Sequence, residues 1–230
     1  MSDLLPPVDA APLWMTLKVA VVATALALLA GVLLGWVVAR TRLPGRAALE
    51  ALCMLPLVLP PTVLGYGLLR LAGRRSAFGA WLRESFDYTP IFSWHGAVLA
   101  SALVALPLVL KGASTAFAQV DRRLEAAACT LRQPRAAVFL RVTLPLAWPG
   151  ILAGTLLAFA RAMGEFGASL MVAGSIPGQT QTASMAIYDA VQAGRDDVAA
   201  SLAVAVSLLS VGVLLASNRV FAPRGAEVPR

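Results

Sequence analysis

Two oppositely charged side chains lie four residues apart at the end of a long apolar stretch. These are Arg161 and Glu165, and because residues i and i+4 share one face of a helix, the two can form an ion pair. Charged groups in an apolar membrane segment are candidates for function, since lipid offers them no hydrogen bonds. Two roles stay open: a structural pair that lets both charges enter a helix bundle, or an arginine that helps to steer an anion.

A second apolar stretch contains adjacent prolines, Pro60 and Pro61, followed by Thr62. Proline lacks a backbone N–H and crowds the preceding turn, so the pair should bend a helix and leave carbonyl groups free. Broken helices commonly line the substrate cavity of transporters. We therefore predict that a translocation pathway includes Pro60, Pro61, Thr62, Arg161 and Glu165.

The usual motifs of catalysis and nucleotide hydrolysis do not occur. There is no GxxxxGK[ST] phosphate loop, and Lys18 and Lys111 lie in apolar stretches from which their amines should reach toward water. His95 has no HExxH or Cys/His grouping around it. Cys53 and Cys129 have no CxxC spacing, so we expect buried thiols, no metal site and no cofactor. The chain is not expected to be an enzyme, and energy for pumping must come from a partner.

The composition indicates an integral membrane protein. Of 230 residues, 59% are hydrophobic and 13% are charged, and the mean hydropathy is +0.77. Disorder is excluded by this apolar content, and a soluble enzyme is disfavoured because globular domains carry about 25% charged residues. About 20 helical residues cross a membrane, and five segments qualify: 13–39, 47–69, 94–118, 145–163 and 198–218. We expect an all-α membrane protein with a single transmembrane domain over 1–230, in which 183–191 is a short re-entrant or interfacial helix.

The connecting loops fall into two sets on opposite sides of the membrane. One set holds eleven Lys and Arg, in loops 40–46, 119–144 and 219–230. The other set holds five, in loops 1–12, 70–93 and 162–197. Cytoplasmic loops carry the excess of basic residues. The N-terminus is therefore predicted outside and the C-terminus in the cytoplasm, and the net charge of +7 requires no nucleic acid as a partner.

The longest cytoplasmic loop, 119–144, contains a short amphipathic helix. Asp121 can cap a helix that runs from Arg122 to Leu131, and Pro134 interrupts it. Positions at three- and four-residue spacing form one apolar or small face: Leu124, Ala127, Ala128 and Leu131. Such a helix either packs on its own bundle or docks on a cytoplasmic partner.

These residues also carry a resemblance to a known family. Glu125-Ala126-Ala127-Ala128, followed by Leu144-Pro145, resembles the cytoplasmic "EAA" loop of ABC importer permeases. Three further stretches resemble molybdate permeases: LPLVLPPTV at 55–63, GEFGA at 164–168 and IPGQTQT at 176–182. Sulfate/thiosulfate and tungstate permeases are similar enough to remain alternatives. The resemblance extends from about 13 to 216 and implies the type I ABC importer permease fold in a bacterial or archaeal inner membrane.

The resemblance also implies the partners of the chain. They are a second copy of the chain in a homodimer, two cytoplasmic ATP-hydrolysing subunits, a periplasmic or extracellular molybdate-binding protein, and membrane lipid. The residues implied in coupling to the ATPase are Glu125, Ala126, Ala127, Ala128, Leu131, Leu144 and Pro145.

One position departs from the family pattern. Arg132 stands where the family usually has glycine, which suits the left-handed conformation that ends a helix. Gln133-Pro134 could make the break instead. An extra alanine after Glu125 leaves Glu125 and Ala126 as alternative positions for the family's glutamate.

Two other classes of function need features that are weak or missing. An ion-coupled secondary transporter would need intramembrane acidic groups and inverted repeats. Only Glu50 and Glu165 are candidates, both near helix ends, and no repeat is evident. A membrane enzyme would need a nucleophile or metal constellation.

Overall fold

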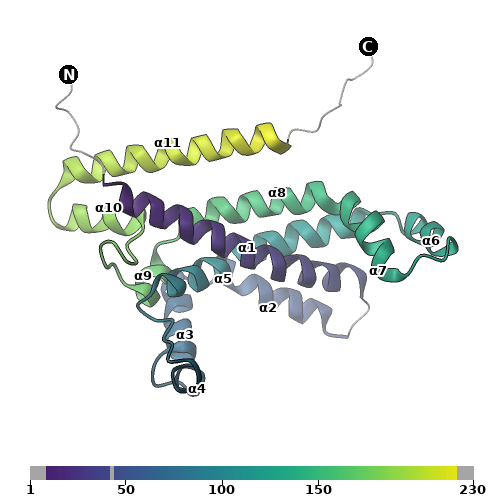
Figure 1. The fold of residues 1–230 in the computed structure, drawn as a ribbon, viewed down its shortest axis with the longest axis horizontal. Helices are drawn as coiled ribbons and strands as arrows, with labels where there is room; N and C mark the ends of the chain where they lie inside the picture. Colours follow the sequence, from purple (N-terminus) through teal and green to yellow (C-terminus); the bar gives the residue numbers. More distant parts are fainter. Residues whose placement is uncertain (1–8, 42–43, 222–230) are drawn as a thin grey trace, which may run out of the picture.

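The computed structural model describes residues 9–41 and 44–221, and this part of the chain forms helices without β-strands. Four helices are long and apolar enough to cross a membrane: α1 (Ala10–Arg40), α5 (Trp94–Gln119), α8 (Leu144–Met163) and α11 (Asp196–Phe221). They extend along the length of the molecule (Figure 1). The first, third, fourth and fifth predicted spans are confirmed as helices, whereas Arg42 and the basic residues after 221 lie outside the described residues.

The second predicted span is bent at the paired prolines, as predicted, and the bend is a full break between two helices. Residues 47–69 divide into α2 (Arg46–Val58) and α3 (Pro61–Ala72), whose axes differ in direction by 113°. Leu59 and Pro60 between them are extended, as expected for residues that precede proline. Pro61 then begins α3, where its missing N–H costs nothing. The paired prolines therefore end one helix and start another.

The α2–α3 pair nevertheless returns the chain along α5 in the opposite direction. Near the start of α2, Glu50 Oε1 lies 2.9 Å from Nζ of Lys111, which is in the second half of α5. Further along, Leu64 in α3 packs with Ala100 and Val104 in the first half of α5. Because α1 and α5 run in the same direction, this return is what connects them (Figure 1).

Glycine allows the long helices to approach each other closely. A Cβ on Gly31 would lie 2.7 Å from Cγ1 of Val109, so the glycine is required where α1 crosses α5. A Cβ on Gly154 would lie 2.9 Å from the carbonyl oxygen of Leu108, so α8 is equally close to α5. Small residues at such crossings are typical of membrane helix pairs, which gain stability from close packing.

Three short helices lie at the end of the bundle where α1 and α5 begin. They are α4 (Ala77–Phe86), α9 (Gly167–Ala173) and α10 (Ala183–Gln192). The predicted short segment 183–191 is thus a helix, and its first N–H donates to Thr16 Oγ1 on α1 at 2.8 Å. The sequence did not predict α4 or α9.

Candidate coupling site

At the opposite end of the bundle, the chain between α5 and α8 forms α6 (Arg122–Thr130), the single turn α7 (Arg135–Val138) and the π-helical turn η1 (Phe139–Thr143). Oδ1 of Asp121 accepts from the Arg123 N–H at 2.8 Å, so the predicted cap is confirmed. The predicted helix ends one residue early, at Thr130, and Leu131 follows as its C-cap.

Arg132 itself takes the conformation that glycine would supply. Its φ is 55°, in the left-handed region, and its N–H donates to the Cys129 carbonyl at 3.1 Å. The chain therefore turns at Arg132, and the alternative break at Gln133-Pro134 is wrong. An arginine in this region is held at a cost of about 1–2 kcal/mol.

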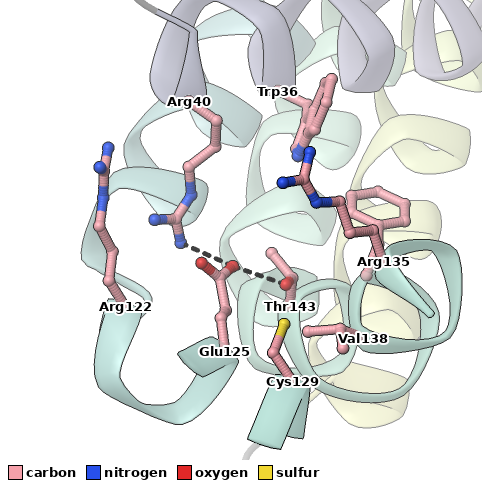
Figure 2. Close-up of a pocket in the computed structure, with 9 residues that line it drawn as sticks. Trp36, Arg40, Arg122, Glu125, Cys129, Arg135, Val138 and Thr143 are labelled. Carbon is pink, nitrogen blue, oxygen red and sulfur yellow. Dashed lines mark hydrogen bonds and ion pairs between the residues drawn. The ribbon is translucent and has the colours of Figure 1, made fainter. Parts of the chain in front are cut away.

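Helix α6 has two distinct faces. Leu124 and Leu131 are 49% and 76% exposed, and Ala127 between them is also exposed. The other face, which carries Arg122, Glu125 and Cys129, lines a cavity of about 470 Å³ together with residues of α1, α7 and η1 (Figure 2). The outward face is therefore largely exposed to solvent in the described part of this chain.

Neither cysteine is buried, so that expectation is wrong. Cys129 is exposed on α6 and Cys53 is half-buried on α2. Cys129 belongs to the face of α6 that lines the cavity.

Glu125 points inward, toward the bundle (Figure 2). Its Oε1 lies 3.2 Å from Nη2 of Arg40, the last residue of α1, and accepts a hydrogen bond from Thr143 Oγ1 at 2.6 Å. Nη2 of Arg40 also donates to the Val120 carbonyl at the end of α5, at 3.1 Å. A single carboxylate thus connects α6 to α1 and to the turn that precedes α8.

This connection is stronger than an ordinary surface ion pair. The side chains of Arg40 and Glu125 are only 9% and 25% exposed, and hydrogen bonds that involve a charged group contribute about 1.5–3 kcal/mol each. A displacement of α6 would therefore pull on the ends of two membrane helices. Sequence reasoning identified Glu125 but missed Arg40 and Thr143, which carry no local motif.

The π-helical turn sets the direction in which α8 leaves the site. Pro145 cannot donate a hydrogen bond and crowds the turn before it, while the Leu144 N–H bonds back to the Phe139 carbonyl, five residues earlier. Leu144 is half-buried against the cluster around Phe117, and Pro145 is exposed in the first turn of α8. Leu144 therefore packs on the bundle and not on the outward face of α6.

The predicted pathway residues lie together at the other end of the bundle. Nη1 of Arg161 is 2.9 Å from Oε2 of Glu165, which is 2% exposed. Oε1 of Glu165 accepts from the Ala168 N–H at 3.0 Å, at the start of α9. A Cβ on Gly167 would lie 2.9 Å from Cβ of Pro61, so α9 begins directly against the proline break.

Comparison with known proteins supports a transport role. Residues 31–225 match the family described as "Binding-protein-dependent transport system inner membrane component". The molybdenum transport system permease protein ModB of Escherichia coli K12 is 42% identical over 203 residues, which cover 87% of this chain and 89% of that protein. The putative molybdenum transport system permease protein YvgM of Bacillus subtilis is 42% identical over 199 residues, covering 86% and 88%.

A more distant relative and a solved structure agree with this family. The sulfate transport system permease protein CysT of E. coli K12 is 35% identical over 185 residues, which cover 80% of this chain and 66% of that protein. A chain from the inward-facing MetNI methionine ABC transporter superposes with a TM-score of 0.70 at 18% identity, covering 92% of this chain and 93% of that chain. The latter likeness confirms the type I permease fold.

Proposed function

Because the chain belongs to the family of binding-protein-dependent transport system inner membrane components, we propose that it is the permease subunit that carries molybdate in an ATP-driven importer. It is a multi-pass inner-membrane protein with the type I ABC importer permease fold. The assignment of molybdate is favoured by 42% identity to proteins named for molybdenum transport, against 35% to one named for sulfate. Sulfate/thiosulfate or tungstate is the second candidate, because these oxyanions share the charge and tetrahedral shape of molybdate.

The observation that best supports this function is the exposed apolar face of α6. Leu124, Ala127 and Leu131 present an apolar surface to the cytoplasm, while Glu125 on the other face ties the helix to Arg40 and Thr143. A cytoplasmic ATP-hydrolysing subunit on this face can therefore move α1 and α8. The permease itself hydrolyses no ATP, and two ATPase subunits supply the energy.

Two copies of the chain form the pathway. A divalent oxyanion cannot cross hydrocarbon, because an isolated buried charge costs tens of kcal/mol by Born estimates. Five spans are few to enclose a polar route with two gates, and twofold homodimers are the commonest assembly. The N-terminus lies outside and the C-terminus in the cytoplasm. The ion is delivered from outside by a molybdate-binding protein, to a route that includes Pro60, Pro61, Thr62, Arg161 and Glu165.

An ion-coupled secondary transporter is disfavoured by the same geometry. The two candidate acidic groups, Glu50 and Glu165, are each already engaged, with Lys111 at 2.9 Å and Arg161 at 2.9 Å. A coupling site needs an acidic group that is free to bind the ion, and a cationic side chain occupies each of these carboxylates.

The test is uptake of labelled molybdate at nanomolar concentration by cells that lack this protein and by the same cells re-supplied with it. Excess sulfate or tungstate serves as competitor. We expect uptake to return with the protein and to resist sulfate. If re-supply changes nothing for molybdate but restores sulfate uptake, the oxyanion is misassigned while the importer class stands.

A further inference from the structure

The helix α4 lies beside the bundle, at the level where α5 begins. Ala72 at the end of α3 packs with Ile91, just before α5, and with Val172 of α9. Helices α3 and α4 project sideways from the long helices, in the half of the molecule away from α6 (Figure 1). Where a membrane helix begins, a sideways helix lies at the depth of the lipid headgroups.

The turn between α3 and α4 is tightly built. Ser76 Oγ accepts from the Gly79 N–H at 2.8 Å, and the Ser76 N–H donates to the Gly73 carbonyl at 2.9 Å. A Cβ on Gly79 would lie 2.1 Å from the Gly73 carbonyl oxygen. These contacts hold α3 and α4 at a defined angle to each other.

This turn concentrates unpaired positive charge. Arg70, Arg74 and Arg75 line a cavity of about 380 Å³, together with Leu69, Gly73 and Ser76. No acidic side chain lines the cavity, and within the described residues none of the three arginines forms an ion pair. Converging guanidinium groups bind phosphate through paired, charge-assisted hydrogen bonds.

Directly after the arginines, α4 presents exposed aromatic rings. Phe78, Trp81 and Phe86 are 55%, 53% and 65% exposed, and their rings contact one another at centroid distances of 6.0 and 5.6 Å. Aromatic side chains beside arginines are typical of a helix that lies in the membrane interface, with its rings in lipid and its cations at the headgroups.

We propose that the turn between α3 and α4 binds the phosphate group of an anionic phospholipid, in the cavity formed by Arg70, Arg74 and Arg75, while the rings of α4 contact the acyl chains of the same leaflet. An anionic lipid matches both features, because it offers a phosphate and an apolar body at adjacent depths. A free oxyanion would occupy the arginines but leave the three rings in water. The site anchors α3, and with it the proline break, to the membrane surface.

The first test counts phosphatidylglycerol retained by the intact transporter in native mass spectrometry. The test variant is Arg70→Gln/Arg74→Gln/Arg75→Gln, and the matched control is Arg83→Gln, which removes an exposed arginine of α4 that does not line the cavity. We expect the triple variant to retain about tenfold less of the lipid and the control to match the unaltered protein. Equal retention by the triple variant, or loss of the second copy instead of lipid, would overturn the proposal.

A second measurement does not depend on the folding of the triple variant. The intact transporter is placed in bilayers that contain brominated phosphatidylglycerol, whose bromines quench nearby tryptophans, and its fluorescence is compared with that of the Trp81→Phe variant. We expect brominated phosphatidylglycerol to quench the fluorescence of Trp81. Brominated phosphatidylcholine should quench the same fluorescence less. No quenched component from Trp81 would place α4 out of the membrane. Release of the lipid by millimolar phosphate or molybdate would identify a site for free anions instead.

Discussion

Glu125 Oε1 lies 3.2 Å from Arg40 Nη2 and joins the short helix α6 to the last turn of α1. The same oxygen accepts from Thr143, just before α8. Glu125 is therefore a link inside this subunit, and under the proposed function the contact surface for a partner is the opposite face of α6. Under that proposal, docking and transmission of movement use opposite faces of one short helix.

We predict that Glu125→Gln lowers uptake more than ATP hydrolysis. The amide keeps the size of the side chain but loses the charge that holds Arg40, worth about 1.5–3 kcal/mol, so uptake should fall about tenfold while the ATPase subunits still bind and hydrolyse ATP. Uptake and hydrolysis are measured in the same proteoliposomes. The control is Glu50→Gln, which removes a carboxylate paired with Lys111 far from α6. Equal losses of uptake and hydrolysis would contradict a transmitting role.

A charge on the outward face of α6 should prevent docking. We expect Ala127→Glu to abolish uptake while the protein still inserts, because it places a desolvated carboxylate in the apolar contact. The control is Gln133→Glu, which adds the same charge at an exposed position after the helix. Docking is measured directly by whether the ATPase subunits co-purify with the variant. Normal transport by Ala127→Glu would mean that the partner binds elsewhere.

The sequence predicted those helices that are marked by a long, continuous run of apolar residues. Each of α1, α5, α8 and α11 contains an apolar window long enough to cross a membrane, so hydropathy alone identifies them. Helix α4 has ten residues and α9 has seven, too short for such a window. The prolines predicted a bend in the second span, but not that the helix would end and restart at 113°.

Contacts between residues far apart in the chain could not be predicted from any local sequence pattern. Arg40 entered the sequence argument only as one basic residue of a loop, because no spacing relates it to Glu125. The Arg161–Glu165 pair was predictable, since both partners lie on adjacent turns. Its burial and its second bond, to the Ala168 N–H, depend on the packing of α9 and could not be foreseen.

Replacing Arg132 by glycine should stabilise the protein. The left-handed backbone at φ 55° costs about 1–2 kcal/mol for a residue with a Cβ and little for glycine. Glycine also increases the freedom of the unfolded chain, so we expect a net gain of about 1 kcal/mol and a higher unfolding temperature of the purified transporter. Gln133→Gly serves as control, because no left-handed backbone occurs there and the change should be neutral or destabilising. A lower unfolding temperature for Arg132→Gly would contradict the assigned turn.

The close crossing of α8 and α5 should not tolerate a side chain. Gly154→Ala would place a Cβ 2.9 Å from the Leu108 carbonyl oxygen, and backbone cannot move aside cheaply. We expect about 1–3 kcal/mol of destabilisation and less protein in the membrane, measured by immunoblot and by thermal unfolding. Gly212→Ala on α11 is the matched change, since its Cβ would meet nothing within 4 Å. Equal behaviour of the two variants would show that the helices separate freely at this crossing.

The two roles of Arg161 give different results in a double variant. Arg161→Gln alone leaves the carboxylate of Glu165 buried without its cation, and breaking such a pair costs about 3–5 kcal/mol, so we expect little folded protein. Arg161→Gln/Glu165→Gln removes both charges and should restore the amount in the membrane. If the pair is structural, oxyanion uptake per molecule returns with the protein. If Arg161 steers the anion, the protein returns but uptake stays low, and the apparent KM for the oxyanion rises. We expect the first outcome, because Glu165 neutralises the guanidinium at 2.9 Å and leaves little field to attract a divalent anion.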